Sequence, residues 1–195
     1  ILSSGSTGWM AGYSLPVSSY GTRLSFDFSD SHVHLGGPYK GMGVKGNAQS
    51  YFFKLTHPLV QTAKSDLFLY SGYDFVNAST SWNPAGARSY LSDYNLHVWR
   101  TGLYGMTDDD YGRWIGNMAV DFGMAGTDHM NSKSDTTFVK FAASATRVQR
   151  LFSRSMGIVR VGGQYSPNNL FAAEQMQLGG PYTLRGYQPA ELIGD

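Results

Sequence analysis

The sequence contains no cysteine and no long apolar run, and both absences limit what the protein can be. Without cysteine the fold cannot depend on disulfide bonds, which suits a cell-envelope protein built without them. A membrane-spanning helix needs about 20 consecutive apolar residues, whereas the longest apolar runs here extend over only a few residues. Any role in a membrane must therefore depend on β-strands.

Charge is scarce as well. Only 15% of the residues are charged and the net charge is +1, so the chain offers neither a basic surface for nucleic acid nor an acidic tail. Serines never occur in a Gly-x-Ser-x-Gly frame, and no phosphate-binding glycine loop follows a predicted strand. We therefore expect no enzyme, no cofactor, no nucleotide and no nucleic-acid partner.

Two groups of residues have side chains that bind metals elsewhere, and neither predicts a metal site. The consecutive carboxylates of Asp108, Asp109 and Asp110 cannot all converge on one Ca²⁺ ion from an extended chain. His32 and His34 share one face of a predicted strand but lack a third ligand nearby. We expect a solvated turn at the aspartates and solvent-facing histidines.

Aromatic residues and glycine are abundant, with Gly 24, Tyr 13, Phe 11 and Trp 4. They fall in segments that alternate between apolar and polar residues, which is the pattern of β-strands with two differently solvated faces. In one such segment Leu24, Phe26 and Phe28 alternate with polar residues. The predicted segments are 6–15, 22–35, 47–57, 65–77, 90–101, 112–123, 137–149 and 156–165.

The polar positions of these segments predict the lining of a water-filled interior. For 90–101 this assigns Tyr94, Leu96 and Val98 to the lipid side, opposite the polar side chains. The residues predicted to line the interior are Asp27, Lys54, Asp93, Asn95, Asp121, Lys140 and Arg160.

Segment and loop lengths favour a membrane barrel over a soluble β-sandwich. Strands of about ten residues match a tilted crossing of the membrane and are long for a sandwich. Short connections alternate with longer ones rich in Gly, Ser, Asn and Asp, and 102–111 is the one predicted connection that is too long for its place. Aromatic residues near the segment ends are typical of an interfacial girdle. The predicted fold class is an all-β, transmembrane antiparallel β-barrel.

The end of the chain carries a more specific signal. It contains Gln164, then Glu174-Gln175, the turn Leu178-Gly179-Gly180, and the tetrapeptide Leu184-Arg185-Gly186-Tyr187. This run resembles the strand and inward-folded loop of two-partner secretion transporters, the hemolysin activator and hemagglutinin secretion proteins of the TpsB family. The tetrapeptide is similar to the family's Val-Arg-Gly-Phe/Tyr motif, which the barrel-assembly branch of the superfamily shares.

The resemblance implies a sixteen-stranded barrel in the bacterial outer membrane, surrounded by its lipid. Residues 1–195 would then supply strands four to eleven, with 166–195 as the loop folded into the interior. The N-terminal periplasmic polypeptide-binding domains and the last strands would lie outside this sequence. The implied partner is an unfolded exoprotein, a hemolysin or an adhesin with an N-terminal secretion domain, which crosses without nucleotide.

Within the loop, the resemblance makes Arg185 the central residue of a latch formed by Leu184, Arg185, Gly186 and Tyr187. A planar guanidinium can pair bidentately with a carboxylate of the barrel wall. The family counterpart of Arg185 reaches strands that follow the loop, beyond Asp195. Asp93 and Asp121 are possible substitutes within this chain.

Two alternatives stay open at this point. A barrel-assembly insertase of the same superfamily would carry the same Arg-Gly-Tyr loop and insert strands at a lateral seam. A complete eight-stranded outer-membrane barrel would alternate in the same way, but it has little room for a long inward loop.

Overall fold

The computed structural model describes residues 6–34, 45–82, 89–128, 136–152, 155–171, 174–178 and 192–194. Ten β-strands run through them, and no helix among these residues is long and apolar enough to cross a membrane. The strands are β1 (Ser6–Pro16), β2 (Arg23–His34), β3 (Lys45–Gln61), β4 (Ser65–Trp82), β5 (Ser89–Asp109), β6 (Gly112–Asp128), β7 (Thr137–Phe152), β8 (Ser155–Tyr165), β9 (Met176–Leu178) and β10 (Leu192–Gly194).

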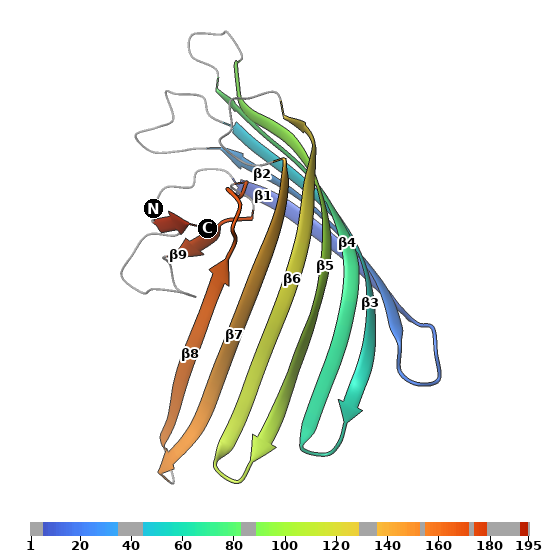
Figure 1. The fold of residues 1–195 in the computed structure, drawn as a ribbon, viewed down its shortest axis with the longest axis vertical. Coiled ribbons are helices and arrows are strands. Elements are labelled where there is room, and N and C mark those ends of the chain that lie inside the picture. The colour runs from blue at the N-terminus through green and yellow to red at the C-terminus, as the bar shows by residue number, and fades with distance from the viewer. Residues whose placement is uncertain are drawn as a thin grey trace.

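Strands β1 to β8 form one antiparallel sheet in which each strand pairs with its neighbours in sequence, while β9 and β10 pair with each other (Figure 1). The sheet is open, because β1 and β8 do not pair within the described residues. All eight predicted segments are strands of this sheet, so the all-β antiparallel prediction is confirmed.

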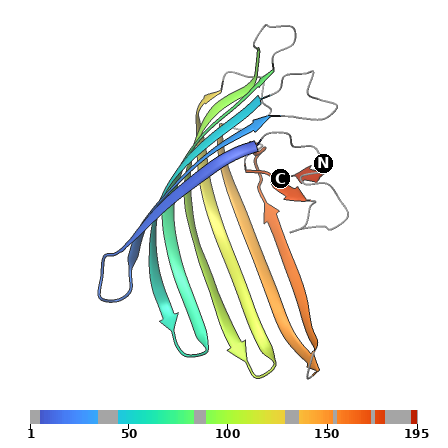
Figure 2. The ribbon, with the colours of Figure 1, turned by 180° about the vertical axis from the view of Figure 1, so that it is seen from behind.

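Short turns join β3 to β4, β5 to β6 and β7 to β8 at one end of the sheet, which Figure 2 shows from behind. The predicted long connection at 102–111 is wrong. β5 continues to Asp109, and only Asp110 and Tyr111 separate it from β6. In the turn between β1 and β2, Gly21 has a φ of 83°, which favours glycine, and its N–H donates to the Ser18 carbonyl.

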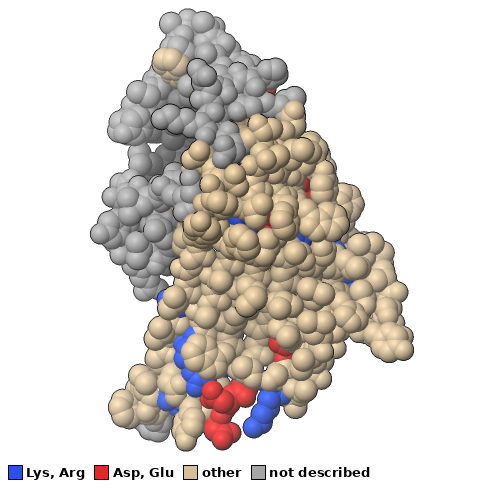
Figure 3. All heavy atoms as spheres, viewed as in Figure 1, with Lys and Arg blue, Asp and Glu red and all other residues tan. Residues whose placement is uncertain are grey.

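At this short-turn end, charged side chains pair with one another (Figure 3). Arg113 donates to both carboxylate oxygens of Asp108, at 2.5 and 2.7 Å. Arg147 does the same to Asp109, at 2.6 and 2.9 Å, while its guanidinium lies 5.1 Å from the centre of the Trp114 ring. The aspartates therefore serve the ion pairs of the turn.

The two faces of the sheet differ, and the segment that follows β8 identifies them. We call the face that this segment covers the inner face and the opposite one the outer face. On the outer face an aromatic row crosses five strands, with ring centres 4.7 to 6.2 Å apart. Such a row is typical of the interfacial girdle of a membrane barrel. Its members are Trp9, Phe28, Tyr51, Phe75 and His97.

The face assignment of the strand now seen as β5 is wrong. Tyr94, Leu96 and Val98 point to the inner face, where they are buried. Asp93 and Asn95 lie on the outer face, and the Cα partners of these two residues on β4 are Ser79 and Asn77. The sequence pattern gave the wrong faces for a physical reason. In this part of β5 the inner face is apolar because the returning segment packs on it, and the outer face is polar because it lies beyond the aromatic row.

Candidate functional site: a segment docked on the inner wall

After β8 the chain turns back over the inner face, and polar contacts with β7 fix the start of this return. The Val139 N–H donates to Asn168 Oδ1 at 3.1 Å, and Ser166 Oγ donates to the Val139 carbonyl at 2.9 Å. Ser166 Oγ also accepts from the Asn168 N–H at 3.1 Å. Beyond the residues of β7 that pair with β8, these side chains form hydrogen bonds with the β7 backbone. Such bonds are needed because buried backbone groups must be paired. We call residues 166–171 and 174–178 the docked segment.

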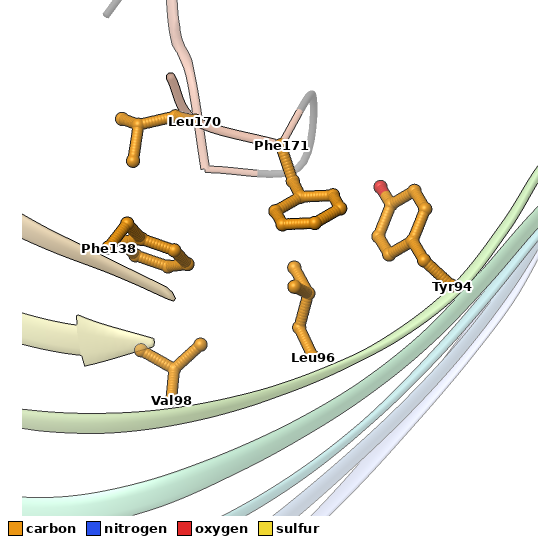
Figure 4. Close-up of a cluster of buried hydrophobic side chains, with 6 residues drawn as sticks. All are labelled: Tyr94, Leu96, Val98, Phe138, Leu170 and Phe171. Atoms are coloured by element: carbon orange, nitrogen blue, oxygen red, sulfur yellow. The ribbon is translucent and has the colours of Figure 1, made fainter. Parts of the chain in front are cut away.

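An apolar cluster then holds the docked segment against the sheet (Figure 4). Leu170 and Phe171 come from the docked segment, and the other members come from β5 and β7. The rings of Phe171 and Tyr94 have their centres 5.2 Å apart. Full burial of one such side chain stabilises by about 1.5–3 kcal/mol. The six buried members are Tyr94, Leu96, Val98, Phe138, Leu170 and Phe171.

Next to this cluster, Glu174 of the docked segment enters a buried group of charges on β4 to β7. Arg100 Nη2 donates to Glu174 Oε1 at 2.5 Å and Arg100 Nη1 to Oε2 at 3.2 Å. Lys140 Nζ donates to Oε2 of the same carboxylate. Only 4% of Glu174 is exposed. A fork-to-fork pair with a second cation is among the strongest geometries available to a carboxylate.

Two wall carboxylates complete this charge group. Arg100 Nη1 donates to Asp121 Oδ2 at 2.6 Å, and Lys140 Nζ lies 3.1 Å from the same oxygen. Arg100 also donates to Asp74 Oδ2 at 3.3 Å, while Ser50 Oγ donates to Asp74 Oδ1 at 2.8 Å. The wall alone thus balances two cations with two carboxylates, and docking adds the carboxylate of Glu174. We call these five charged residues the anchor: Asp74, Arg100, Asp121, Lys140 and Glu174.

The register of the sheet brings the anchor together. Arg100, Asp121 and Lys140 are successive Cα partners across β5, β6 and β7, so their side chains leave the same face side by side. Burial alone opposes ionisation of Glu174, but Arg100 and Lys140 more than offset this effect. The pKa of Glu174 therefore lies below its ordinary value.

The backbone of the docked segment is also tied to β8. Gln164 Nε2, from the end of β8, donates to the Glu174 carbonyl at 3.0 Å. The N–H groups of Glu174 and Gln175 both donate to the Phe171 carbonyl. Shortly after this turn, β9 pairs with β10. The docked segment is thus held by apolar packing, by charge and by a local turn.

Residues 3–195 match the model of the haemolysin secretion/activation protein family ShlB/FhaC/HecB. The chain belongs to this family. Its members are outer-membrane β-barrel transporters of two-partner secretion, so the predicted family and outer-membrane location are confirmed. No match was found among curated protein sequences.

Two solved structures have a fold similar to that of this family member. CdiB from Escherichia coli has a TM-score of 0.79 and 23% identity, over 94% of this chain and 35% of its own. CdiB from Acinetobacter baumannii has a TM-score of 0.74 and 19% identity, over 96% of this chain and 34% of its own. The chain thus spans about a third of the length of either structure. The fold agrees with a wall segment of a larger barrel, and not with a closed barrel of eight strands.

Five of the residues predicted to line the interior share the inner face. Asp121 and Lys140 belong to the anchor, and Lys54 lies on the same row of Cα partners, two strands from Arg100. Asp27 is opposite Phe52, and Arg160 is opposite Thr146 near the short turns. The prediction that Asp93 and Asn95 line the interior is wrong, because both lie on the outer face.

The predicted loop residues divide between described and undescribed parts of the chain. Gln164 ends β8 and contacts the docked segment, and Leu178 ends β9. Asp121, considered above as a substitute partner of Arg185, pairs with Arg100 and Lys140. Asp93 is not a candidate partner, since it is on the outer face. The residues Gly179, Gly180, Leu184, Arg185, Gly186 and Tyr187 lie outside the described residues.

Sequence reasoning missed the central residues of the anchor, Arg100 and Glu174. Glu174 stood in the motif that carried the family resemblance, yet we assigned it no role. One signal could have found it, because a lone glutamate among apolar residues next to Leu170 and Phe171 needs a buried cation. Arg100 was not singled out because it lies at the end of the segment whose face was assigned incorrectly.

Proposed function

We propose that this chain forms part of the wall of an outer-membrane pore that secretes an unfolded exoprotein, with the docked segment anchored inside that pore. The observation that carries the proposal is the contact of Glu174 with Arg100 and Lys140 on the inner face. A wall that only had to seal a barrel would not need a buried charge group that binds a later part of the chain.

The inner face is suited to a moving polypeptide. Away from the anchor it carries charges of both signs, among them Asp27, Lys54 and Arg160. A wall of mixed sign offers weak contacts at several places and no single deep binding site, which favours passage over retention. The cargo is a hemolysin or an adhesin with an N-terminal secretion domain, and its folding outside the cell biases the movement. Lipid contacts the outer face.

Secretion by the product of the complete gene tests this proposal. The gene is expressed in a Gram-negative host together with an exoprotein that carries an N-terminal secretion domain. Exoprotein in the medium is measured relative to folded barrel in the outer membrane. We expect efficient release from the native protein. Exoprotein that stays in the periplasm while the barrel is folded and abundant would contradict the proposal.

An anchor variant makes the same assay specific for the site. Arg100→Gln removes the guanidinium that binds Glu174 and leaves the outer face unchanged. We expect the barrel to assemble. We also expect the amount of exoprotein in the medium, relative to folded barrel, to differ from that of native protein. The matched control is Arg113→Gln, which removes an exposed arginine paired with Asp108 at the short-turn end. Secretion that is identical in native and Arg100→Gln protein would remove the anchor from the mechanism.

A further inference from the structure

Beside the anchor, the inner face of β3, β4 and β5 contains a hollow of about 250 Å³ that the docked segment does not line. Three of its side chains are aromatic and two are cationic. Arg100 belongs to both the hollow and the anchor, so the two surfaces are continuous. We call it the aromatic hollow, and its members are Phe52, Lys54, Tyr70, Arg100 and Tyr104.

Glycines on neighbouring strands allow two of these rings to lie low on the sheet. A Cβ atom at Gly72 would lie 2.7 Å from the Phe52 ring, and one at Gly102 would lie 3.0 Å from the Tyr70 ring. Tyr104 stacks on Phe68, with ring centres 5.1 Å apart and an interplanar angle of 16°. The hollow is therefore bounded by ring faces that leave room above them.

Lys54 gives the hollow a charge that the wall does not neutralise. Its Nζ lies 5.5 Å from the centre of the Phe52 ring. It forms no salt bridge with any residue in the described ranges. Arg100, by contrast, is surrounded by three carboxylates. A cation beside aromatic rings is suited to a ligand that brings both an acidic and an aromatic or aliphatic group.

The docked segment shows how this wall binds a polypeptide. It contributes Phe171 to an apolar contact with Tyr94 and, three positions later, Glu174 to a cation. The aromatic hollow repeats these two kinds of contact on the neighbouring surface, with rings in place of the apolar cluster and Lys54 in place of Arg100 and Lys140. The docked segment therefore indicates which side chains a ligand of the aromatic hollow would carry, namely an apolar or aromatic one and an acidic one.

We infer that the aromatic hollow is a docking surface for the exoprotein in transit, which it binds as an extended segment bearing an apolar or aromatic side chain near an acidic one. This inference rests on the proposed function and specifies its substrate chemistry. Aromatic contacts tolerate many sequences because they need only an apolar face. The hollow thus favours a composition, and a succession of different cargo segments can use it.

Photocrosslinking with peptides of defined composition tests the inference. The photoreactive amino acid p-benzoylphenylalanine replaces Tyr104 in the purified product of the complete gene. Three labelled peptides of equal length are compared, containing Phe with Glu, Ser with Glu, and Phe with Lys. We expect about tenfold more adduct from the Phe/Glu peptide than from the Ser/Glu peptide, since an aromatic contact of this kind is lost. Lys54→Glu should reverse the preference between Phe/Glu and Phe/Lys.

The matched control places the same amino acid at Leu103, which is adjacent in sequence and on the outer face. Equal adducts from all three peptides, or equal labelling at Leu103 and Tyr104, would overturn the inference. An adduct that joins Tyr104 only to another part of the same protein would also overturn it, because that part would be the occupant. The assay needs no secretion. Normal secretion together with no preference among the peptides would refute this inference alone. Failure of the native protein to secrete would refute the proposed function.

Discussion

Glu174 Oε1 lies 2.5 Å from Nη2 of Arg100, a residue 74 positions earlier in the chain. This contact connects the docked segment to the middle of β5, and it is almost completely buried on the glutamate side. Removing one partner of a buried ion pair leaves the other charge without compensation. The contact therefore contributes strongly to how firmly the docked segment binds to the inner face of the sheet.

Glu174→Gln should release the docked segment from the wall. Loss of one buried partner costs about 3–5 kcal/mol, and this cost falls on docking because the strand ladder of β1 to β8 is unchanged. We expect faster proteolysis within 166–178 while the barrel keeps its heat-modifiable mobility in electrophoresis. Asp108→Asn is the control, since Asp108 and its partner Arg113 are both exposed and such a pair contributes little to stability. Equal proteolysis of the two variants would show that the anchor does not hold the segment.

Docking should also depend on acidity in a defined direction. The pKa of Glu174 is lowered by its cations from an ordinary value of 4.5. A depressed pKa means that the ion pair contributes fully above the ordinary value and is lost as the pH falls through the lowered one. Spin labels at Met176 and Thr107 should report an unchanged distance between pH 8 and about pH 5, and a broader distribution only in stronger acid. Release already near neutral pH would contradict the assigned ionisation.

The lipid side of the wall can be tested by arginine substitutions at matched positions. Phe53→Arg and Val120→Arg place a charge on the outer face within the apolar band, at an expected cost of about 2–4 kcal/mol. Asn117→Arg, on the inner face, should be tolerated. Asn77→Arg is a control for depth, because Asn77 is on the outer face but beyond the aromatic row. Folded barrel in the outer membrane is the measure, and equal losses from all four variants would refute the assigned faces.

Labelling of cysteines on intact cells tests the orientation. Cysteines at Gly41, Ala85 and Asn131, in connections outside the described residues, should react with an impermeant maleimide. Cysteines at Ser18, in the chain between β1 and β2, and at Ser153, in the chain between β7 and β8, should react only after the outer membrane is opened. Labelling of both sets on intact cells would exclude the predicted topology.

The role of Arg185 stays a prediction. Arg185→Lys keeps the charge but loses the bidentate geometry, so both Arg185→Lys and Arg185→Ala should insert as barrels and secrete less cargo. The assay is exoprotein in the medium relative to folded barrel. Full secretion by Arg185→Lys would refute the geometric argument, and full secretion by Arg185→Ala would refute a latch.

Most of the wall could be predicted from the sequence because a lipid-facing strand alternates visibly. The predicted segment with Leu24, Phe26 and Phe28 forms such a strand, and these three side chains lie on the outer face. The strand containing Leu96 and Val98 was assigned incorrectly, since its apolar residues serve an internal contact with Leu170 and Phe171. Alternation in the sequence shows that the two faces of a strand differ. It does not show whether the apolar face contacts lipid or another part of the protein.

The ends of the strands were harder to predict for a related reason. Beyond the aromatic row, side chains are polar on the outer face, so the predicted segment 65–77 ends at Asn77 although β4 continues to Trp82. Backbone pairing continues there without an apolar pattern. The anchor was hidden as well, because its residues come from five separate parts of the chain. The register of the sheet brings Arg100, Asp121 and Lys140 side by side, and the docked segment adds Glu174.

Under the proposed function, the length of β4 beyond the aromatic row affects where a cargo would leave the protein. The six residues from Asn77 to Trp82 remain paired with β5 and, at about 3.3 Å per residue, extend this part of the wall by about 20 Å. If the chain lines a secretion pore as proposed, this stretch continues the wall beyond the apolar band of the outer face. An emerging chain would be shielded from the lipid headgroups until it is clear of the membrane surface, where it can begin to fold.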